Sequence, residues 1–561
     1  MAALHGGELV VKALKQEGVE QIFSLSGGHI APIYDACIDH GVKIYDTRHE
    51  QAAAHMAEAW ARLTGKPGVL VVTAGPGFTN AVTGIANAWL SGSPMVVISG
   101  HSSMRETDTC SLQELDQLPI ISPITKWSRT IQDVTRIPEY ISMAFRHACS
   151  GKPGPVYLEI PTNVIMKKCE AEDAAFFPPG FPAPRPGVDP ELIRKAVELI
   201  EKAENPVVVA GSGLWYSQAF ASLKKWIEYS GLPVFTKAQG RGGIPDNHPL
   251  CFGSAVPLVP GASSTALSSS DLLILLGTRL DMFMNFGRPP VCSLETKLIQ
   301  IDINPLELGR NRGLELGITG DLESALTTLL SAYQKLGKPR DRRSWVDTLR
   351  EVHTSGREDL KRQGEDSNLP MHPLRLLAEI KKCLEPDSII AADGGDTQVW
   401  TSMAMEVNLP GHYIDTGLFG CLGVGVPFAL TAKIAYPKSR VFQICGDGAI
   451  GFNLMEFDTA IRHKLPIVCV VNNDQAWGMI KHGQELTYGK DRIIGCELGL
   501  TRYDKMVEAI GGYGELVRKP EDVAPAINRA IASGKPALIN VETDPDAVSP
   551  GSYALVMAVS G

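Results

Sequence analysis

The sequence predicts an α/β protein built from three open parallel-sheet domains, and three observations support this class. Short aliphatic and β-branched runs alternate with longer helical patterns, as in "GVLVVTAGPG", "PVVVAGSG" and "RVFQICGDG". Continuous apolar runs of this kind are typical of parallel strands that are covered on both faces. The length of 561 residues exceeds what a single hydrophobic core supports. Two linker-like stretches then divide the chain into three blocks.

The first linker-like stretch, residues 176–191, reads "FFPPGFPAPRPGVDPE" and is too rich in proline to hold a regular element. The second stretch, residues 337–373, is charged and ends in prolines. Together they predict domains at residues 1–175, 190–335 and 370–550.

The first and third blocks share one layout. Residues 68–100 run through a strand, a glycine-rich turn, a helix, a proline and a strand, and residues 440–474 repeat this order. In the helix expected within residues 440–474, Leu454, Phe457 and Ile461 fall three or four positions apart and form one apolar face. Ligands of open α/β sheets bind beyond the carboxyl ends of the strands. The tripeptides "GPG", "GDG" and "NND" occur at those places.

Composition excludes several classes of function. A net charge of −9 offers no basic face for nucleic acid. No stretch approaches the roughly 20 apolar residues of a membrane span, and the first residues lack the pattern of a signal peptide. Eleven cysteines without a CxxC pair indicate buried thiols in a reducing compartment rather than disulfides or a zinc site. We therefore expect a cytoplasmic protein that acts on small molecules.

The segment "CGDGAIG", residues 445–451, suggests a phosphate and metal site. Gly446 and Gly448 let the backbone turn sharply, and the helix that follows offers its amides to an anion. Asp447 would repel a phosphate, because two unit charges ~5 Å apart cost about 3 kcal/mol at an effective dielectric near 20. A divalent cation such as magnesium or calcium would bridge the two. The tip of the next strand, "NND", should supply a second ligand.

As one unit, these features resemble the thiamine-diphosphate motif, in which GDG is followed about 25 residues later by NN. The resemblance implies thiamine diphosphate and Mg²⁺, with the metal held by Asp447, by Asp474 and by the main-chain carbonyl of Ala476. The family usually has asparagine at the middle position, and here Asn473 directly precedes Asp474. Both residues therefore remain candidates for the side-chain ligand.

The first block supplies the expected activating acid. "KIYDTRHEQAAAH" places Glu50 at the head of an alanine-rich helix. The resemblance implies that this glutamate bonds N1′ of the aminopyrimidine, which then deprotonates C2 of the thiazolium. "TAGPGFTN" matches the next family motif and adds Thr73 and Asn80 as cofactor contacts. A lone glutamate here could also simply favour the helix dipole, but disabled relatives often lack it, so its presence indicates an enzyme.

Two more segments match the family, "AADGGDTQVW" and "GLFGCLGVGVPFAL". They imply that the Gly420 carbonyl accepts from the 4′-amino group and that Leu422 wedges the cofactor into a bent shape. Met479 would lie beside the thiazolium. The implied cofactor contacts in full are Glu50, Thr73, Asn80, Gly395, Asp396, Thr397, Gly420, Leu422, Gly446, Asp447, Gly448, Ala449, Asn473, Asp474, Ala476, Trp477, Gly478 and Met479.

Among family members, the sequence most resembles benzaldehyde lyase, through segments such as "GGELVVKAL", "SGGHI", "FTNAV" and "LQELDQ". This resemblance implies that His29 and Gln113 move protons and orient the substrate beside the catalytic Glu50. On the opposite wall, the tyrosine and histidine of that enzyme are replaced by Gln398 and Thr416. We therefore expect a C–C lyase or carboligase acting on 2-hydroxy ketones (acyloins), aldehydes or 2-keto acids through a Breslow-type enamine.

Two alternatives stay open within the family. "DTQVW" and "TDPDAVSPGS" are similar to acetolactate synthases, although the tryptophan that follows the "QAWGMIKHG" loop in those enzymes is missing. "LGTRLDMFMNFG" and "IQIDINPLELG" are similar to 2-hydroxyacyl-CoA lyase and oxalyl-CoA decarboxylase, which lack a histidine matching His29. Ile480 stands where pyruvate decarboxylases carry a second glutamate, which disfavours that reaction.

The central block is ambiguous. Gly211 and Gly213 follow one strand and Asp302 ends another, but Tyr216 occupies the place of a third glycine. The block therefore either supports the other two or binds FAD or the ADP part of CoA. A nucleotide-dependent oxidoreductase would require a complete GxGxxG, which is missing. Because the acid and the metal site lie in different blocks, the resemblance implies a homo-oligomer, a dimer or a dimer of dimers.

Overall fold

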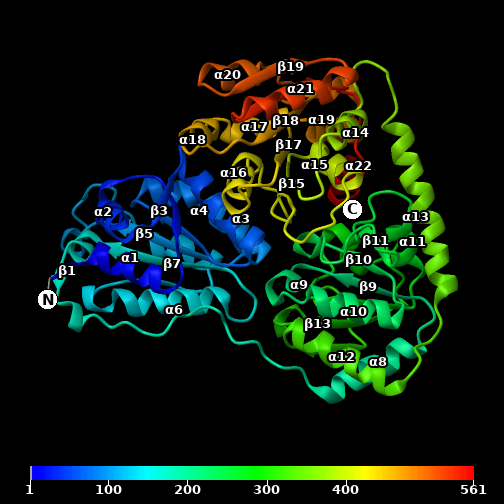
Figure 1. Ribbon diagram of the computed structural model, residues 1–561, viewed down its shortest axis with the longest axis horizontal. Coiled ribbons are helices and arrows are strands. Elements are labelled where there is room, and N and C mark those ends of the chain that lie inside the picture. The colour runs from blue at the N-terminus through cyan, green and yellow to red at the C-terminus, as the bar shows by residue number, and fades with distance from the viewer. Residues whose placement is uncertain (1–2, 561) are drawn as a thin grey trace.

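The computed structural model describes residues 3–560 and contains three six-stranded sheets in which all neighbouring strands are parallel. Figure 1 shows the sheets in three bodies, with the first domain at the left, the central domain at the lower right and the third domain at the top. Helices cover both faces of each sheet. The predicted α/β class with three open parallel-sheet domains is confirmed.

The first sheet has the order β3–β2–β4–β5–β7–β6. Its strands are β2 (Gln21–Ser24), β3 (Lys43–Asp46), β4 (Gly68–Val72), β5 (Met95–His101), β6 (Ser128–Thr130) and β7 (Pro155–Pro161). The main helices around it are α1 (Gly6–Gln16), α2 (Ala31–His40), α3 (Glu50–Thr64), α4 (Pro76–Ser91) and α6 (Ile137–Cys149). Strand β4 is buried along its whole length, as expected for a strand that carries helices on both faces.

The third sheet has the order β16–β15–β17–β18–β20–β19. Its strands are β15 (Ile389–Asp393), β16 (Tyr413–Ile414), β17 (Val441–Gly446), β18 (Val468–Asn473), β19 (Tyr513–Val517) and β20 (Ala537–Glu542). Its helices include α14 (Pro373–Lys381), α15 (Asp396–Ala404), α16 (Gly425–Ala435), α17 (Asp447–Asn453), α18 (Glu456–Arg462), α19 (Gly478–Tyr488), α21 (Pro520–Ser533) and α22 (Pro550–Ser560).

One predicted helix of the third domain is interrupted. The sequence indicates a single amphipathic helix after "GDG", but the structure divides it into α17 and α18 at Leu454 and Met455. The amides of Phe457 and Asp458 bond carbonyls three residues back, so a tighter turn separates the two helices. The apolar face survives the break, since Leu454 and Phe457 are both buried.

The central sheet has the order β11–β10–β9–β12–β13–β14, the strand order of a Rossmann fold. Its strands are β9 (Pro206–Ala210), β10 (Val234–Thr236), β11 (Cys251–Ser254), β12 (Leu272–Leu276), β13 (Lys297–Asp302) and β14 (Leu316–Thr319). The flanking helices are α8 (Pro190–Lys202), α9 (Ser212–Ser217), α10 (Phe220–Ser230), α11 (Ala262–Ser269) and α12 (Leu322–Leu336).

The two connections between domains differ in structure. Residues 176–189 form no regular element, as their prolines predict, and α8 begins at Pro190. The charged stretch of residues 337–373 instead contains a 21-residue helix, α13 (Arg343–Gln363), which runs along the right edge of Figure 1 from the central domain toward the third. Trp345 and Leu349 are buried against the central domain, so α13 belongs to that core more than to a linker.

Helix α3 lies at the junction of the domains. It packs against α4 of its own domain and against α16 of the third domain, and one apolar cluster spans both. Near its end, Arg62 donates to the main-chain oxygen of Asp415 at 2.8 Å, and Trp215 of the central domain donates to Ala61 at 3.2 Å. The helix that begins at Glu50 is therefore fixed by all three domains.

Within the described residues, no helix has both the length and the apolar character needed to cross a membrane.

Candidate functional site

Two buried carboxylates meet at the carboxyl edge of the third sheet. Asp447 is the first residue of α17, and Asp474 follows the end of β18. Since β17 and β18 are neighbours with Gly446 opposite Asn472, their tips lie side by side. Asp447 is 1% exposed, and burial together with the charge of Asp474 raises its pKa well above the usual range. Burial also raises the pKa of Asp474.

This pair fits a divalent cation. Oδ1 of Asp447 accepts from its neighbour Gly448 at 2.9 Å, but Oδ2 is buried and has no hydrogen-bond partner among the described residues. Two adjacent carboxylates repel each other unless a cation lies between them, and carboxylate oxygens are the ligands that Mg²⁺ and Ca²⁺ prefer. The described residues contain no cluster of three or more His, Cys, Asp or Glu side chains suited to a metal. A third donor would therefore be a carbonyl such as that of Ala476.

Asn473 and Asp474 point to different places. The Asn473 side chain is fully buried, donates to Oδ1 of Asn540 at 2.9 Å and accepts from the amide of Gln475. Successive strand residues face opposite sides of a sheet, so Asn473 turns into the interior of the domain. Asp474 instead joins Asp447. The geometry therefore favours Asp474 over Asn473 as the side-chain ligand.

Asn472 belongs to this edge although sequence reasoning passed over it. Its amide nitrogen donates to Oγ1 of Thr397 at 3.0 Å, and its buried oxygen has no partner among the described residues. The contact leaves the Thr397 hydroxyl hydrogen free to donate to a ligand. The only sequence signal was the run of three polar residues at the strand tip.

The glycines of this edge sit where side chains would collide. A Cβ on Gly448 would lie 2.5 Å from the ring of Trp477, and one on Gly478 would lie 2.4 Å from Oδ2 of Asp474. A Cβ on Gly395 would lie 2.8 Å from Cβ of Met479. The structure thus brings together the segments around residues 395, 447 and 477, as the implied diphosphate contacts require. Ala449 lies buried in the first turn of α17 beside Gly446 and Asp447.

The side chain of Asp396 is held by partners within the third domain. Its carboxylate accepts from Nδ1 of His482 at 2.8 Å, from the hydroxyl of Ser552 at 2.7 Å and from the hydroxyl of Ser549. All of these partners are buried. The carboxylate therefore anchors the last helix of the chain, and only the main-chain amide of Asp396 at the start of α15 is left for a diphosphate.

Gly420 and Leu422 lie on the loop between β16 and α16. Gly420 has a φ of +65°, a left-handed conformation that favours glycine. Leu422 is half-buried and packs on the apolar cluster shared by the first and third domains. Gly420, the implied acceptor for the 4′-amino group, and Leu422, the implied support for the bent cofactor, therefore lie on one loop.

A second cluster surrounds the "TAGPG" turn of the first domain. Glu50 is buried at the start of α3 and accepts from Nδ2 of Asn80 on α4 at 2.9 Å. A Cβ on Gly77 would lie 2.6 Å from Thr73 and 3.4 Å from Oε1 of Glu50. The structure thus brings Glu50, Thr73 and Asn80 together around Gly77.

His29 and Gln113 join the same turn through Thr73. Nδ1 of His29 lies 3.2 Å from Oγ1 of Thr73, whose hydroxyl faces Oε1 of Gln113 at 3.5 Å. If Thr73 donates to Gln113, Nδ1 of His29 carries the proton and Nε2 is left as an acceptor. Burial, reinforced by nearby His101, lowers the pKa of His29, so the ring is neutral at pH 7. Such a ring can accept a proton from a substrate hydroxyl.

Gln117 supports this turn and was not expected from the sequence. Its side chain accepts from the amide of Gly75 at 3.2 Å and donates to the carbonyl of Gly100 at 3.1 Å and to Glu159 at 3.2 Å. It is almost fully buried. A buried glutamine amid a loop-rich segment carries no sequence pattern that would distinguish it from Gln113.

The third domain also holds the start of α3. The carboxylate of Glu456, at the head of α18, accepts from the amides of Arg48 at 3.0 Å and His49 at 3.1 Å. These residues immediately precede Glu50. The position of the acid in the first domain therefore depends on a side chain of the third.

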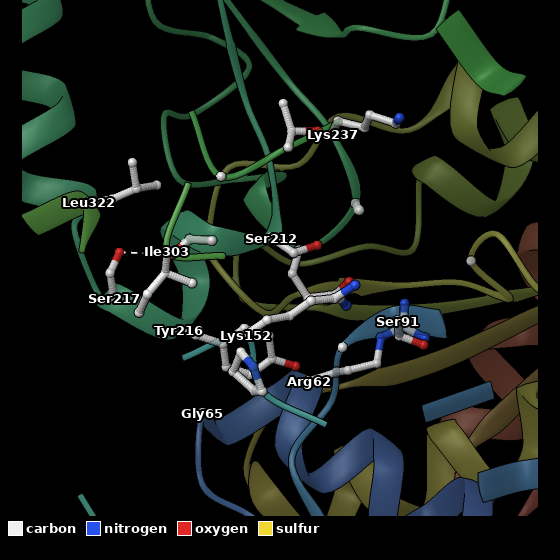
Figure 2. Close-up of a pocket in the computed structure, with 18 of the residues that line it drawn as sticks. Arg62, Gly65, Ser91, Lys152, Ser212, Tyr216, Ser217, Lys237, Ile303 and Leu322 are labelled. Atoms are coloured by element: carbon white, nitrogen blue, oxygen red, sulfur yellow. Dashed lines mark hydrogen bonds between the residues drawn. The ribbon is translucent and has the colours of Figure 1, made fainter. Parts of the chain in front are cut away.

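A cavity of about 580 Å³ lies among the three domains. Arg62 and Lys152 of the first domain and Ser212, Tyr216 and Lys237 of the central domain line it, and Figure 2 shows Lys237 far from Arg62 and Lys152. Gln398, Val399 and Ser402 of the third domain also line it. Thr416 donates to Oε1 of Gln398 at 2.6 Å and so orients its amide.

The cavity covers the carboxyl ends of the central strands. Gly213 after β9 and Gly277 after β12 approach closely, since a Cβ on Gly213 would lie 2.7 Å from Cα of Gly277. Strands β9 and β12 are neighbours at which the strand order reverses, which is where Rossmann-like sheets bind ligands. Asp302 also lines the cavity, and burial raises its pKa to about 6.

Comparison with known proteins gives matches along nearly the whole chain. Residues 4–120, 193–329 and 393–541 match the models of the N-terminal TPP binding domain, the central domain and the C-terminal TPP binding domain of thiamine pyrophosphate enzymes. The acetolactate synthase large subunit of Mycobacterium tuberculosis is 35% identical over 548 residues, 98% of this chain and 97% of that protein. The 2-hydroxyacyl-CoA lyase 1 of Mus musculus is 33% identical over 558 residues, 97% of this chain and 94% of that protein. A 2-hydroxyacyl-CoA lyase of Arabidopsis thaliana is 31% identical over 560 residues, 97% of this chain and 96% of that protein.

Proposed function

The chain belongs to the thiamine pyrophosphate enzyme family, and we propose that it is a C–C lyase or carboligase for 2-hydroxy ketones, aldehydes or 2-keto acids. The observation that carries the proposal is the grouping of Glu50 and Asn80 with His29, Thr73 and Gln113 around a single turn. An acid for the cofactor and a proton carrier for the substrate thus share one place. Such a pairing suits a reaction that makes or breaks a bond next to a carbonyl.

Each residue of this group has a defined task in the proposed reaction. Bound thiamine diphosphate would supply the electron sink for the carbon that is cleaved or joined. The carboxyl of Glu50 would bond the pyrimidine ring, with Asn80 fixing its orientation. Nε2 of His29 would take the proton from a substrate hydroxyl or return it to a carbonyl oxygen. Gln113 would orient the same oxygen through its amide.

In the proposal, Mg²⁺ links the diphosphate to the third domain through Asp447, Asp474 and the Ala476 carbonyl. Oδ2 of Asp447, which is buried and has no hydrogen-bond partner among the described residues, supports this assignment. The helix amides that begin at Asp447 would face the diphosphate oxygens. Thr397 would add a hydroxyl donor.

The two clusters lie on different sheets, and we infer that a second copy of the chain completes each site. Exposed apolar side chains support this proposal, because they flank both halves. Leu112, next to Gln113, is 78% exposed, and Phe452 on α17 is 53% exposed. Monomeric proteins rarely leave large apolar side chains gathered at a functional edge. A homodimer, or a dimer of dimers, would cover them.

A second candidate is a 2-hydroxyacyl-CoA lyase, and the central cavity favours it. The cavity runs from Gln398 and Val399 of the third domain to the strand tips of the central domain, and it carries Lys152 and Lys237. It has the room and the position for the nucleotide part of CoA, or for FAD. Lys152 is 2.9 Å from Glu307 and Lys237 is 2.5 Å from Asp281, so a phosphate would have to compete with both ion pairs. All eleven cysteines are unpaired, which supports a reducing compartment for the protein.

The first experiment is a calorimetric titration of the protein with thiamine diphosphate and Mg²⁺. We expect saturable binding that is lost when EDTA removes the metal. Glu50→Gln should bind the cofactor but lower kcat by about 10² to 10⁴, the range for a lost acid–base group. Glu191→Gln changes a glutamate in the first turn of α8 and controls for the helix dipole, so its kcat should stay normal. A wild-type protein that binds no cofactor would overturn the proposal.

The second experiment identifies the substrate. Acyloins, 2-keto acids and 2-hydroxyacyl-CoA thioesters are incubated with the loaded enzyme, and the products are separated and identified. Cleavage of free acyloins supports the first candidate, whereas turnover confined to the CoA thioesters supports the second.

A further inference from the structure

A buried carboxylate holds the loop that carries Gly420 and Leu422. Asp393, at the end of β15, is completely buried. Its Oδ2 accepts from the amide of Gly423 at 3.0 Å and from the amide of Gly425 at 2.8 Å, while Oδ1 accepts from Gly394 at 2.7 Å. One side chain thus fixes two amides of the loop against the third sheet.

A second side chain, on α17, holds the same loop. Nδ2 of Asn453 donates to the carbonyl of Gly423 at 2.8 Å. Asn453 lies at the end of α17, the helix that begins at Asp447. Gly423 has a φ of +87°, and a Cβ there would lie 2.5 Å from Cβ of Phe452. The loop is therefore pressed against α17 and cannot shift without breaking one of these contacts.

We propose that Asp393 and Asn453 are positioning residues that fix the Gly420 carbonyl and Leu422 relative to the metal-bearing helix α17. The inference rests on the proposed function, in which Gly420 and Leu422 meet the cofactor. Neither Asp393 nor Asn453 reaches the cofactor in this scheme. Their effect is to hold the acceptor and the wedge in register with Asp447, because small displacements at such a place reduce rates strongly.

Asp393→Asn is the sharpest variant because it keeps the shape of the side chain. If the amide oxygen replaces Oδ2 toward Gly423 and Gly425, the amide nitrogen faces the N–H of Gly394, and two donors meet. If the amide turns over, both loop bonds are lost. At least one of the three hydrogen bonds is lost in either orientation.

The first readout uses the protein without cofactor. Amide hydrogen exchange, followed by mass spectrometry over residues 389–395 and 417–430, should accelerate by about 10- to 100-fold in Asp393→Asn in the segment whose hydrogen bond is lost, because Asp393 holds the amide of Gly394 as well as those of Gly423 and Gly425. Asn453→Ala should loosen residues 417–430 as well. This second variant lies on a helix end and carries the test should Asp393→Asn fail to fold.

The second readout uses the loaded enzyme. Exchange of the C2 proton of bound thiamine diphosphate, measured by proton NMR after acid quenching, should slow by about 10- to 100-fold in both variants. The dissociation constant of the cofactor should change by less than about threefold, because the diphosphate and metal contacts are untouched. A simple loss of folding would instead lower the C2 exchange rate and the affinity for the cofactor together.

Glu17→Gln is the matched control. Glu17 is a buried carboxylate in the first domain that accepts from the amides of Gly180 at 2.8 Å and Phe181 at 3.2 Å. Its variant should loosen that segment and leave residues 417–430 and the C2 exchange rate unchanged. Normal C2 exchange in Asp393→Asn and Asn453→Ala, with normal cofactor binding, would overturn this inference alone. A wild-type protein that binds no cofactor would overturn the proposed function as well.

Discussion

Neighbouring residues at the tip of β18 have opposite surroundings, and this decides what each one does. Asp474 shares the sheet edge with Asp447, whereas Asn473 is tied to Asn540 in the interior. The sequence motif alone places both residues at the metal. The pleat of the strand separates them, because consecutive side chains leave the sheet on opposite faces.

Variants of these two residues should therefore fail in different ways. Asp474→Ala should weaken Mg²⁺-dependent binding of thiamine diphosphate by more than about 100-fold, since a metal ligand is lost. Asn473→Ala should bind the cofactor normally but lower the free energy of unfolding by about 1–3 kcal/mol, because the buried Oδ1 of Asn540 loses its donor. Magnesium titrations and urea unfolding measure the two effects. Loss of metal dependence in Asn473→Ala with normal stability would reverse the assignment.

His29 should make stability depend on pH. Burial and the charge of His101 lower the pKa of His29 in the folded protein, so the unfolded chain takes up a proton at higher pH than the folded one. As pH falls below about 6.5, the free energy of unfolding should decline, by at most about 1.4 kcal/mol per pH unit from this residue. His29→Gln should flatten the decline measured by urea unfolding between pH 5 and 7.5. His101→Gln should make the same decline smaller.

The origin of that pH effect can be checked within the same series. His101→Gln removes one of the two causes but leaves His29 buried, so its effect should be smaller than that of His29→Gln. An unchanged slope in His29→Gln would show that another group is responsible.

The sequence motifs named side chains that lie close together in the structure, but they could not name partners that lie far along the chain. The motifs singled out His29, Thr73, Gln113 and Glu50 one by one, and the structure brings these side chains together around Gly77. They did not predict that the Asp396 carboxylate serves Ser549 and Ser552, more than 150 residues away. Local patterns contain no information about such a contact.

At the scale of elements, the packing of α3 on α4 depends on a missing side chain. A Cβ on Gly84 would lie 2.5 Å from Cβ of Ala54, so the two helices approach more closely than any larger residue would permit. Gly84→Ala should therefore lower the free energy of unfolding by about 1–3 kcal/mol through overpacking. Because α3 begins at Glu50, kcat should fall as well. Chemical unfolding and steady-state kinetics measure both.

Gly356→Ala should change the free energy of unfolding in the opposite direction. Gly356 lies inside α13 and a Cβ there meets nothing within 4 Å. The substitution should raise the free energy of unfolding by about 0.5–1 kcal/mol, since alanine favours a helix. A destabilising Gly356→Ala or a neutral Gly84→Ala would contradict this account of the two glycines.

Elements with strong periodicity were predicted well, and composition misled where charge dominates. The strand, turn and helix series at residues 68–100 appears as β4, α4 and β5. Residues 337–373 suggested a linker because they are charged, yet α13 needs few apolar residues to bind the central domain. A helix held by a narrow apolar stripe resembles a solvated segment in composition.

At the scale of the whole molecule, the proposed shared site predicts complementation between two inactive variants. Glu50→Gln and Asp474→Ala chains are expressed together with different tags, and the mixed dimer is purified on both. One of its two sites then carries both substitutions and the other carries none, so kcat per dimer should be about half that of the wild type. Doubly tagged Glu50→Gln dimers are the control and should be inactive.

The opposite outcome is equally clear. If each site were built within one chain, every site of the mixed dimer would carry one substitution, and its activity would match that of the inactive parents.

The three-sheet architecture could be predicted as a whole because each sheet repeats a local rule of alternating strands and helices. The relations between domains could not. Glu456 bonding Arg48 and His49, and the cavity among the three domains, depend on the way separate sheets dock. Docking depends on surface shape, which a one-dimensional pattern does not record.

The two flanking sheets also share one topology. In each, the strands follow the spatial order second, first, third, fourth, sixth and fifth. Gly75-Pro76-Gly77 after β4 then occupies the place of Gly446-Asp447-Gly448 at the end of β17. Duplication and fusion of one ancestral gene would leave this correspondence, with proline and aspartate marking where the copies diverged. A paired ancestor of that kind would have held two equal halves, and in the proposed shared site each copy would now depend on the other.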